Sequence, residues 1–188
     1  MTVAEVGQVA EASGWSAAAI AAVVAALVSG AVSLTSLWIN GVRAERSRRQ
    51  QLYAEALAVI AAYKEFAYAV RRRRAPLPEK PEIAGDERVR LSEALRDVQR
   101  ELAYYEAWLK GESHHELAKA YSALAAETRT VAGGYMRDAW KRPPLDNDPG
   151  MNIPDIDLSG LGSFEKAYVE EVGKALGFWN IAVPRRRS

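Results

Sequence analysis

Cysteine is absent from the 188-residue chain. Its absence excludes disulfide bonds, thiolate metal ligands and thiol nucleophiles, and it suits a reducing compartment. Histidine is scarce as well, because His114 and His115 are the only two. Adjacent positions on a helix point about 100° apart, so this pair does not have the i, i+4 spacing that lets two histidines bind one metal ion. We therefore predict no metal site and no histidine-based catalysis.

Motifs for nucleotide or cofactor binding are also missing. No glycine-rich stretch matches a phosphate-binding loop of the Walker or dinucleotide type. Several aspartates between Pro143 and Gly162 resemble a loose calcium loop, but their order does not fit an EF-hand, which needs its glycine at the sixth position and a closing glutamate at the twelfth. We therefore expect no catalytic residue and no cofactor, and we predict that the chain is not an enzyme.

Charged residues are absent from residues 17–39. As an α-helix this segment would be about 35 Å long, which is enough to cross a hydrocarbon core of about 30 Å. Trp15 and Trp38 lie near its two ends, where indole rings favour the headgroup region. No Lys or Arg precedes the segment, which argues against a cleaved signal peptide. The sequence therefore predicts a retained transmembrane helix, preceded by a short extracytoplasmic N-terminus over residues 1–16.

Basic residues gather directly after this segment. Residues 43–74 carry a net charge of +6, against −2 before them and −3 after them. The positive-inside rule places the side of the membrane that holds these arginines in the cytoplasm. We therefore predict a single-pass protein of the cell membrane, with its N-terminus outside and its C-terminal domain cytoplasmic. The arginines expected at the membrane junction, in contact with anionic lipid headgroups, are Arg43, Arg46, Arg48 and Arg49.

Small residues line one side of the predicted span at 100° per residue, and Val24 and Leu27 fall on the opposite side. Small side chains let helices approach closely, and lipid gives bulky side chains no reason to hide. We therefore expect self-association or a partner transmembrane helix on this side, with an Ala-rich but monomeric span as the alternative. The predicted association face comprises Ala18, Ala22, Ala25, Ala26, Ser29, Gly30 and Ser33.

Apolar residues recur at alternating steps of three and four in the rest of the chain, which is typical of amphipathic helices. The fold class predicted is therefore all-α, with a cytoplasmic helical hairpin or bundle over residues 40–142. An antiparallel bundle and a short coiled coil both fit the spacing. Three helices are expected, over about residues 43–74, 86–110 and 113–139. Their predicted core positions are Leu52, Ala56, Val59, Tyr63, Phe66 and Val70; Leu91, Leu95, Val98, Leu102, Tyr105 and Leu109; and Leu117, Tyr121, Leu124, Thr128, Val131 and Tyr135.

Glycine, proline and capping residues mark the ends of these helices. Gly111 suits the left-handed position that often follows a helix. Ser113 and Glu116 have the spacing of a capping box at the start of the next one. Prolines then predict a loop over residues 143–162, followed by a C-terminal helix and basic tail over residues 163–188.

Four consecutive arginines, Arg71, Arg72, Arg73 and Arg74, close the first amphipathic helix. Cations at the C-terminus of a helix complement its dipole, and this explanation needs no partner. The alternative is a docking site for an acidic protein partner. A nucleic acid is a less suitable partner, because the net charge of the whole chain is only +1.

These features favour a membrane-anchored, non-enzymatic helical interaction or scaffold module. Its partners would be the lipid bilayer, a second transmembrane helix or copy of the chain, and a cytoplasmic protein whose identity the sequence does not specify. The alternative is a membrane-perturbing effector, such as a stress, exclusion or defence protein, that acts through oligomerisation of its span.

Overall fold

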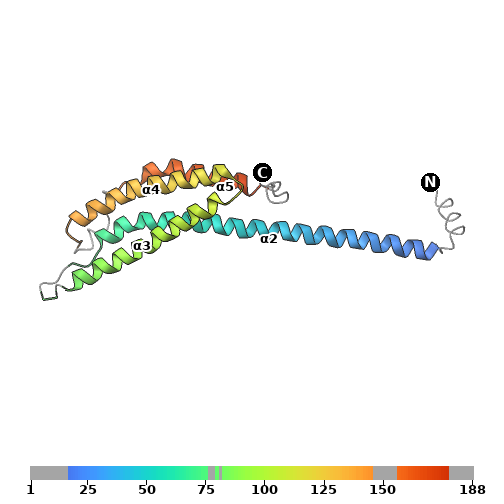
Figure 1. Ribbon diagram of the computed structural model, residues 1–188, viewed down its shortest axis with the longest axis horizontal. Helices are drawn as coiled ribbons and strands as arrows, with labels where there is room; N and C mark the ends of the chain where they lie inside the picture. The colour runs from blue at the N-terminus through green and yellow to red at the C-terminus, as the bar shows by residue number, and fades with distance from the viewer. Residues whose placement is uncertain (1–16, 76–78, 81, 146–155, 178–188) are drawn as a thin grey trace. The chain divides into compact units, whose positions relative to one another are not determined.

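The computed structural model describes residues 17–75, 79–80, 82–145 and 156–177, and all regular elements in these ranges are helices (Figure 1). The all-α fold class predicted from the sequence is therefore confirmed. The chain divides into two compact units, residues 1–47 and residues 48–188, and we call the second the helical unit. In chain order the elements are α2 (Ala17–Arg71), α3 (Glu82–Lys110), α4 (His115–Lys141), the 3-10 helix η2 (Ser159–Leu161) and α5 (Gly162–Ala175).

The first helix of the structure, α2, is a single helix of 55 residues. The sequence predicted two segments here, an apolar one to residue 39 and an amphipathic one from residue 43, and the structure joins them without a break. Gly41 lies at the predicted junction, with open space where its side chain would be. A glycine within a helix lowers stability by about 1 kcal/mol, which is too little to interrupt a long helix. The predicted N-terminus and the residues after 177 lie outside the described residues.

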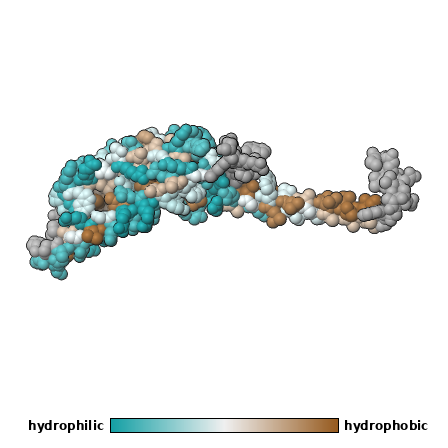
Figure 2. All heavy atoms as spheres, viewed as in Figure 1, coloured by the Kyte–Doolittle hydropathy of each residue, from teal (hydrophilic) through white to brown (hydrophobic). Residues whose placement is uncertain are grey.

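The part of α2 within residues 1–47 exposes its large apolar side chains, which appear as brown spheres in Figure 2. Its most apolar window of 18 residues has a mean hydropathy of 2.2, and none of that window is buried inside the chain. By length and composition α2 is therefore a candidate membrane span. The exposed side chains are Val23, Val24, Leu27, Val28, Val32, Leu34, Leu37 and Trp38.

In the helical unit, the core takes side chains from α2, α3, α4 and α5. On α2 the buried stripe passes through Tyr53, Ile60 and Ala67, which are 0 to 2% exposed. The prediction named Leu52 and Phe66 in this stripe, but both are only half-buried. At these two positions the neighbouring Tyr53 and Ala67 are buried instead, whereas the other four predicted positions of the stripe are buried as predicted. The other buried residues of this stripe are Ala56, Val59, Tyr63 and Val70.

The buried stripe of α4 agrees with the prediction at first and then departs from it. Leu117, Tyr121, Leu124 and Thr128 are fully buried, as the spacing predicts. Val131 and Tyr135 are only half-buried, and the core continues instead through Ala132, Met136 and Ala139. A repeat of seven residues drifts by about 20° per heptad on a helix of 3.6 residues per turn, so the buried face moves to later positions.

Two buried tyrosines bind α4 and α5 to the backbone of α2. The hydroxyl of Tyr121 in α4 donates to the carbonyl oxygen of Ala56 at 3.2 Å. The hydroxyl of Tyr168 in α5 donates to the carbonyl oxygen of Tyr53 at 2.9 Å. The rings of Tyr121 and Tyr168 lie against each other, with centroids 5.4 Å apart. Burial raises the pKa of both hydroxyls, so both remain protonated donors.

Polar contacts at the edge of the core connect α2 with α5 and with α3. Lys64 Nζ of α2 lies 2.7 Å from Glu165 Oε1 of α5. The Tyr105 hydroxyl of α3 donates to Glu55 Oε2 of α2 at 3.1 Å. Because these groups are partly solvated, each pair contributes only about 0.2–1 kcal/mol to stability. Their main effect is therefore to select which faces of the helices meet.

The turn between α3 and α4 differs from its prediction at both ends. Gly111 does not adopt the left-handed conformation; a Cβ there would lie 3.1 Å from the carbonyl oxygen of Trp108, so close approach is what favours glycine. The N-cap of α4 is His114, without a side-chain hydrogen bond to the cap. The predicted capping box of Ser113 and Glu116 is therefore not formed. Glu116 instead binds Lys119 within α4.

The predicted loop over residues 143–162 contains structure at both of its described ends. The backbone N–H of Leu145 donates to the carbonyl oxygen of Arg71 at 3.1 Å, which ties the segment after α4 to the end of α2. At the other end, Leu161 of η2 is fully buried, and α5 begins at the next residue. Residues 146–155 lie outside the described residues.

Replacing Tyr168 by Phe removes one buried hydroxyl and keeps the ring. We expect the free energy of unfolding to fall by about 1 kcal/mol, because the carbonyl of Tyr53 loses its donor while packing is retained. The measurement is urea denaturation of the full-length chain in neutral detergent micelles, followed by circular dichroism. Tyr104→Phe is the control, since Tyr104 is 57% exposed and its hydroxyl is accessible to water. Equal losses from both variants would contradict this role of Tyr168.

Candidate functional site: a basic cleft

A cleft of about 390 Å³ lies in the helical unit where α2 ends, α3 begins and α4 ends. Its volume is within the range of about 300–1,000 Å³ that is usual for ligand sites. We call it the basic cleft, because three of the seven described residues that line it are arginines. The lining residues are Arg73, Arg74, Ala84, Glu87, Arg88, Trp140 and Pro144.

Arg73 lies where the C-termini of α2 and α4 meet. Its Nη1 donates to the carbonyl oxygens of Val70 and Ala139, both at 2.9 Å. Its Nη2 donates to the carbonyl oxygen of Arg142 at 2.6 Å, and less closely to that of Trp140 at 3.4 Å. The last carbonyls of a helix have no partner within it, so one guanidinium satisfies the ends of two helices. Its carbon Cζ also lies 5.0 Å from the centre of the Trp140 ring.

The neighbours of Arg73 are also in contact with the helical unit. Arg71 Nη1 donates to the carbonyl oxygen of Pro143 at 2.7 Å, and the guanidinium of Arg72 lies 5.7 Å from the centre of the Tyr68 ring. Arg71 and Arg73, two of the four arginines predicted as a possible docking site, therefore bind the segment that follows α4. Arg72 and Arg74 are exposed. Arg73 complements the C-terminus of α4 as well as the C-terminus of α2, from which it extends.

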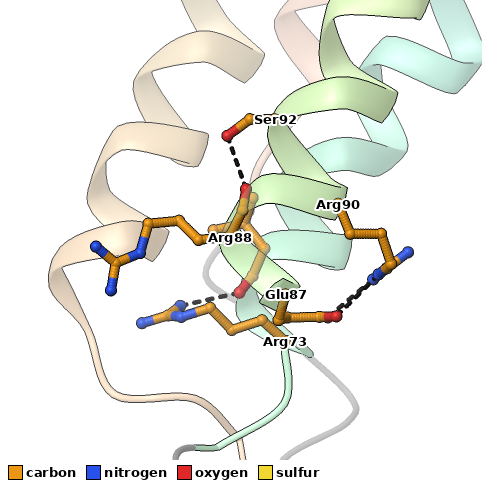
Figure 3. Close-up of polar contacts among 6 residues, drawn as sticks. Arg73, Glu87, Arg88, Arg90 and Ser92 are labelled. Carbon is orange, nitrogen blue, oxygen red and sulfur yellow. Dashed lines mark hydrogen bonds and ion pairs between the residues drawn. The ribbon is translucent and has the colours of Figure 1, made fainter. Parts of the chain in front are cut away.

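Glu87, the one acid among the described residues of the cleft lining, is already paired (Figure 3). Its two carboxylate oxygens accept hydrogen bonds from Nε and Nη2 of Arg90, both at 2.8 Å. These bonds lower the pKa of Glu87, and the backbone N–H and charge of Arg74 lower it further. Glu87 is therefore ionised at neutral pH, with its charge compensated by Arg90 outside the cleft lining.

Arg74 and Arg88 are the two cleft arginines whose guanidinium groups are accessible. Both residues are exposed, and no hydrogen bond or ion pair of either side chain is found within the described residues. The carbonyl oxygen of Arg88 accepts a hydrogen bond from the Ser92 hydroxyl at 2.7 Å, which leaves the Arg88 side chain unengaged (Figure 3). The pKa of Arg73 is lowered by burial first and then by repulsion from Arg71 and Arg88. The arginines of the cleft are thus held together against their mutual repulsion.

The other predicted site residues lie elsewhere. Arg43, Arg46 and Arg48 are exposed on α2. Arg49, predicted to lie at the membrane junction, has its Nη1 3.5 Å from Glu112 Oε2 in the turn between α3 and α4, and its side chain is 17% exposed. Arg49 therefore belongs to the packing of the helical unit. All members of the predicted association face are exposed within residues 1–47, namely Ala18, Ala22, Ala25, Ala26, Ser29, Gly30 and Ser33.

The sequence did not indicate Glu87, Arg88 or Trp140 as site residues. The i, i+3 spacing of Glu87 and Arg90 was a detectable signal of an ion pair, but not of a cleft. Three helix ends meet here only because of tertiary packing. Among the described residues, no group of three or more His, Cys, Asp or Glu could hold a metal ion. Asp157, the described member of the acidic loop, accepts a hydrogen bond from the backbone N–H of Ser159 at 2.9 Å.

Comparison of the chain with models of protein families, with curated proteins and with solved structures gives no match.

Replacing Arg73 by Gln tests its role at the two helix ends. We expect a loss of about 1–2 kcal/mol in the free energy of unfolding, because the carbonyls of Ala139 and Arg142 at the end of α4 lose a charged donor. Denaturant titration of the full-length chain in detergent micelles gives this value. The control is Arg74→Gln, which removes an equal charge from an exposed neighbour and is expected to change stability by less than about 0.5 kcal/mol. A smaller effect from Arg73 than from Arg74 would contradict the assignment.

Proposed function

We propose that this protein is a membrane-anchored, non-enzymatic interaction module of the cell membrane. The observation that carries the proposal is the apolar part of α2, none of whose most apolar window is buried inside the chain. A soluble monomer rarely exposes so much continuous apolar surface, so another apolar environment has to cover it. A lipid bilayer fits both its length and its lack of charge.

The arginines that follow the apolar segment support one orientation. Arg43, Arg46 and Arg48 are exposed on α2, and no Lys or Arg precedes the segment in the sequence. Exposed cations beside a span favour the cytoplasmic face and anionic headgroups. The N-terminus is then outside, and the helical unit functions in the cytoplasm as an antiparallel bundle.

The chemistry of the basic cleft supports recognition rather than catalysis. Its accessible polar groups are guanidiniums, which bind anions and do not exchange protons near neutral pH. Its carboxylate is held in an ion pair with Arg90. A site of this kind is suited to holding a partner.

The orientation can be tested because the natural chain has no cysteine. With Ser13→Cys, we expect labelling by an impermeant thiol reagent added to intact cells. With Ser113→Cys, in the exposed turn before α4, we expect labelling only after lysis. Both variants should stay in the membrane pellet after alkaline extraction. The reverse labelling pattern would overturn the orientation, and release from the pellet would overturn the anchor.

The small residues of α2 suggest that the anchor also self-associates. Replacing Ala22 or Ala26 by Ile should lower association of residues 1–47 in a membrane two-hybrid assay by several-fold, because a branched side chain keeps helix backbones apart. Val24→Ile and Leu27→Ile, on the opposite side, serve as controls and should leave association unchanged. Equal effects from both sides would rule out this face. Loss of membrane potential on overproduction would instead favour a membrane-perturbing effector.

A further inference from the structure

We propose that the basic cleft is the docking site for an acidic peptide segment of a protein partner, whose carboxylates bind Arg74 and Arg88. This inference rests on the proposed function as an interaction module, and it names the surface and the chemistry of the partner.

The accessible hydrogen-bond donors of the cleft are the guanidinium groups of Arg74 and Arg88. Arg73 directs its Nη donors to main-chain carbonyls at the helix ends, so it contributes charge to the cleft but few hydrogen bonds. Arg74 and Arg88 are exposed, and their guanidinium groups have no hydrogen bond or ion pair within the described part of the chain. Each offers a planar set of donors that matches a carboxylate.

The basic cleft carries an excess of positive charge. Among the described residues, three arginines and one acid line the cleft, and that acid, Glu87, is compensated by two hydrogen bonds from Arg90. A cluster of like charges of this kind is relieved by a bound anion. Because the cleft is a concave site lined by Trp140 and Pro144 as well as by the arginines, a carboxylate within it is screened less by salt than one on an open surface.

The shape of the surface around the cleft favours a peptide over a small anion. A second hollow of about 560 Å³ runs along α3 and shares Arg88 with the basic cleft. It adds one cation, Arg96, one acid, Glu93, and the exposed side chain of Val89, which is 58% accessible. Because the two hollows share Arg88, they place Arg74, Arg88 and Arg96 along one surface, with Val89 and a single described acid, Glu93, in its second half. An extended chain with spaced acids fits such a surface, whereas a single phosphate needs donors that converge on one point.

The experiment measures binding of a fluorescein-labelled hexaglutamate peptide to the full-length chain in neutral detergent micelles, by fluorescence anisotropy. We expect Arg74→Gln/Arg88→Gln to weaken binding about fivefold to tenfold, as expected for the loss of two partly solvated ion pairs. Affinity for the unmodified chain should fall as salt is raised. Hexaglutamine should not bind.

The matched control is Arg100→Gln/Lys119→Gln, which removes the same charge from two side chains that are each 72% exposed and lie outside both hollows. Its affinity should equal that of the unmodified chain, and circular dichroism should be unchanged in both double variants. Equal weakening by the two double variants would mean non-specific attraction and would overturn the proposal. Displacement of the peptide by millimolar inorganic phosphate would also overturn it, in favour of a small-anion site.

Two further outcomes separate this proposal from the function on which it rests. Binding of the full-length chain to anionic vesicles that is lost in Arg74→Gln/Arg88→Gln, without peptide binding, would overturn the peptide and assign the cleft to lipid headgroups. Recovery of the same protein partners by the unmodified chain and by this variant, from detergent-solubilised membranes, would overturn the cleft while leaving the interaction module intact. Failure of membrane extraction or of the labelling pattern bears on the anchor alone.

Discussion

The helical unit depends on the need of two buried tyrosine hydroxyls for acceptors. Tyr121 and Tyr168 are almost completely buried, and an unpaired hydroxyl at either position would cost about 1–3 kcal/mol. Both find their acceptors in main-chain carbonyls of α2, at positions 56 and 53. This requirement fixes how far α4 and α5 can slide along α2, which apolar contacts alone leave adjustable. The remaining core is therefore packed around α2.

A similar requirement acts at the other described end of this core. The last carbonyls of α4 need donors, and Arg73 supplies them from beyond the end of α2. The segment after α4 is then held by Arg71, through its side chain and its carbonyl oxygen. The basic cleft follows from these contacts, because they bring the arginines near Arg88 and leave Trp140 over the guanidinium of Arg73. Arginines bound to main-chain carbonyls and the exposed Arg74 thus come from one short stretch of sequence.

Much of this fold could be predicted from the sequence, because the apolar spacing is regular. The spacing identified the amphipathic helices and the first four large core positions of α4, Leu117, Tyr121, Leu124 and Thr128. It failed where chemistry outweighs hydropathy, as at Tyr53 and Ala67, which pack in the centre although Leu52 and Phe66 are more apolar. The apolar and amphipathic segments predicted on either side of Gly41 form one helix, since a glycine weakens a helix but does not end one.

The site was less predictable than the fold. Four adjacent arginines were visible in the sequence, but nothing local distinguishes Arg73, which is bound to carbonyls, from Arg74, which is accessible. That difference arises from the end of α4, some 66 residues away along the chain. Arg88 and Trp140 are likewise ordinary surface residues until the helix ends meet.

The hydrogen bond between Tyr121 and the carbonyl of Ala56 has an evolutionary consequence. A carbonyl is present whatever residue occupies position 56, so selection there acts on size and not on polarity. The side chain has to be small for the ring of Tyr121 to reach the main chain, and Ala56 is only 1% exposed. A larger residue at position 56 would leave the hydroxyl unpaired, unless position 121 had already lost it. In a diverging lineage, a larger residue is therefore expected at position 56 only after the tyrosine at position 121 has been replaced.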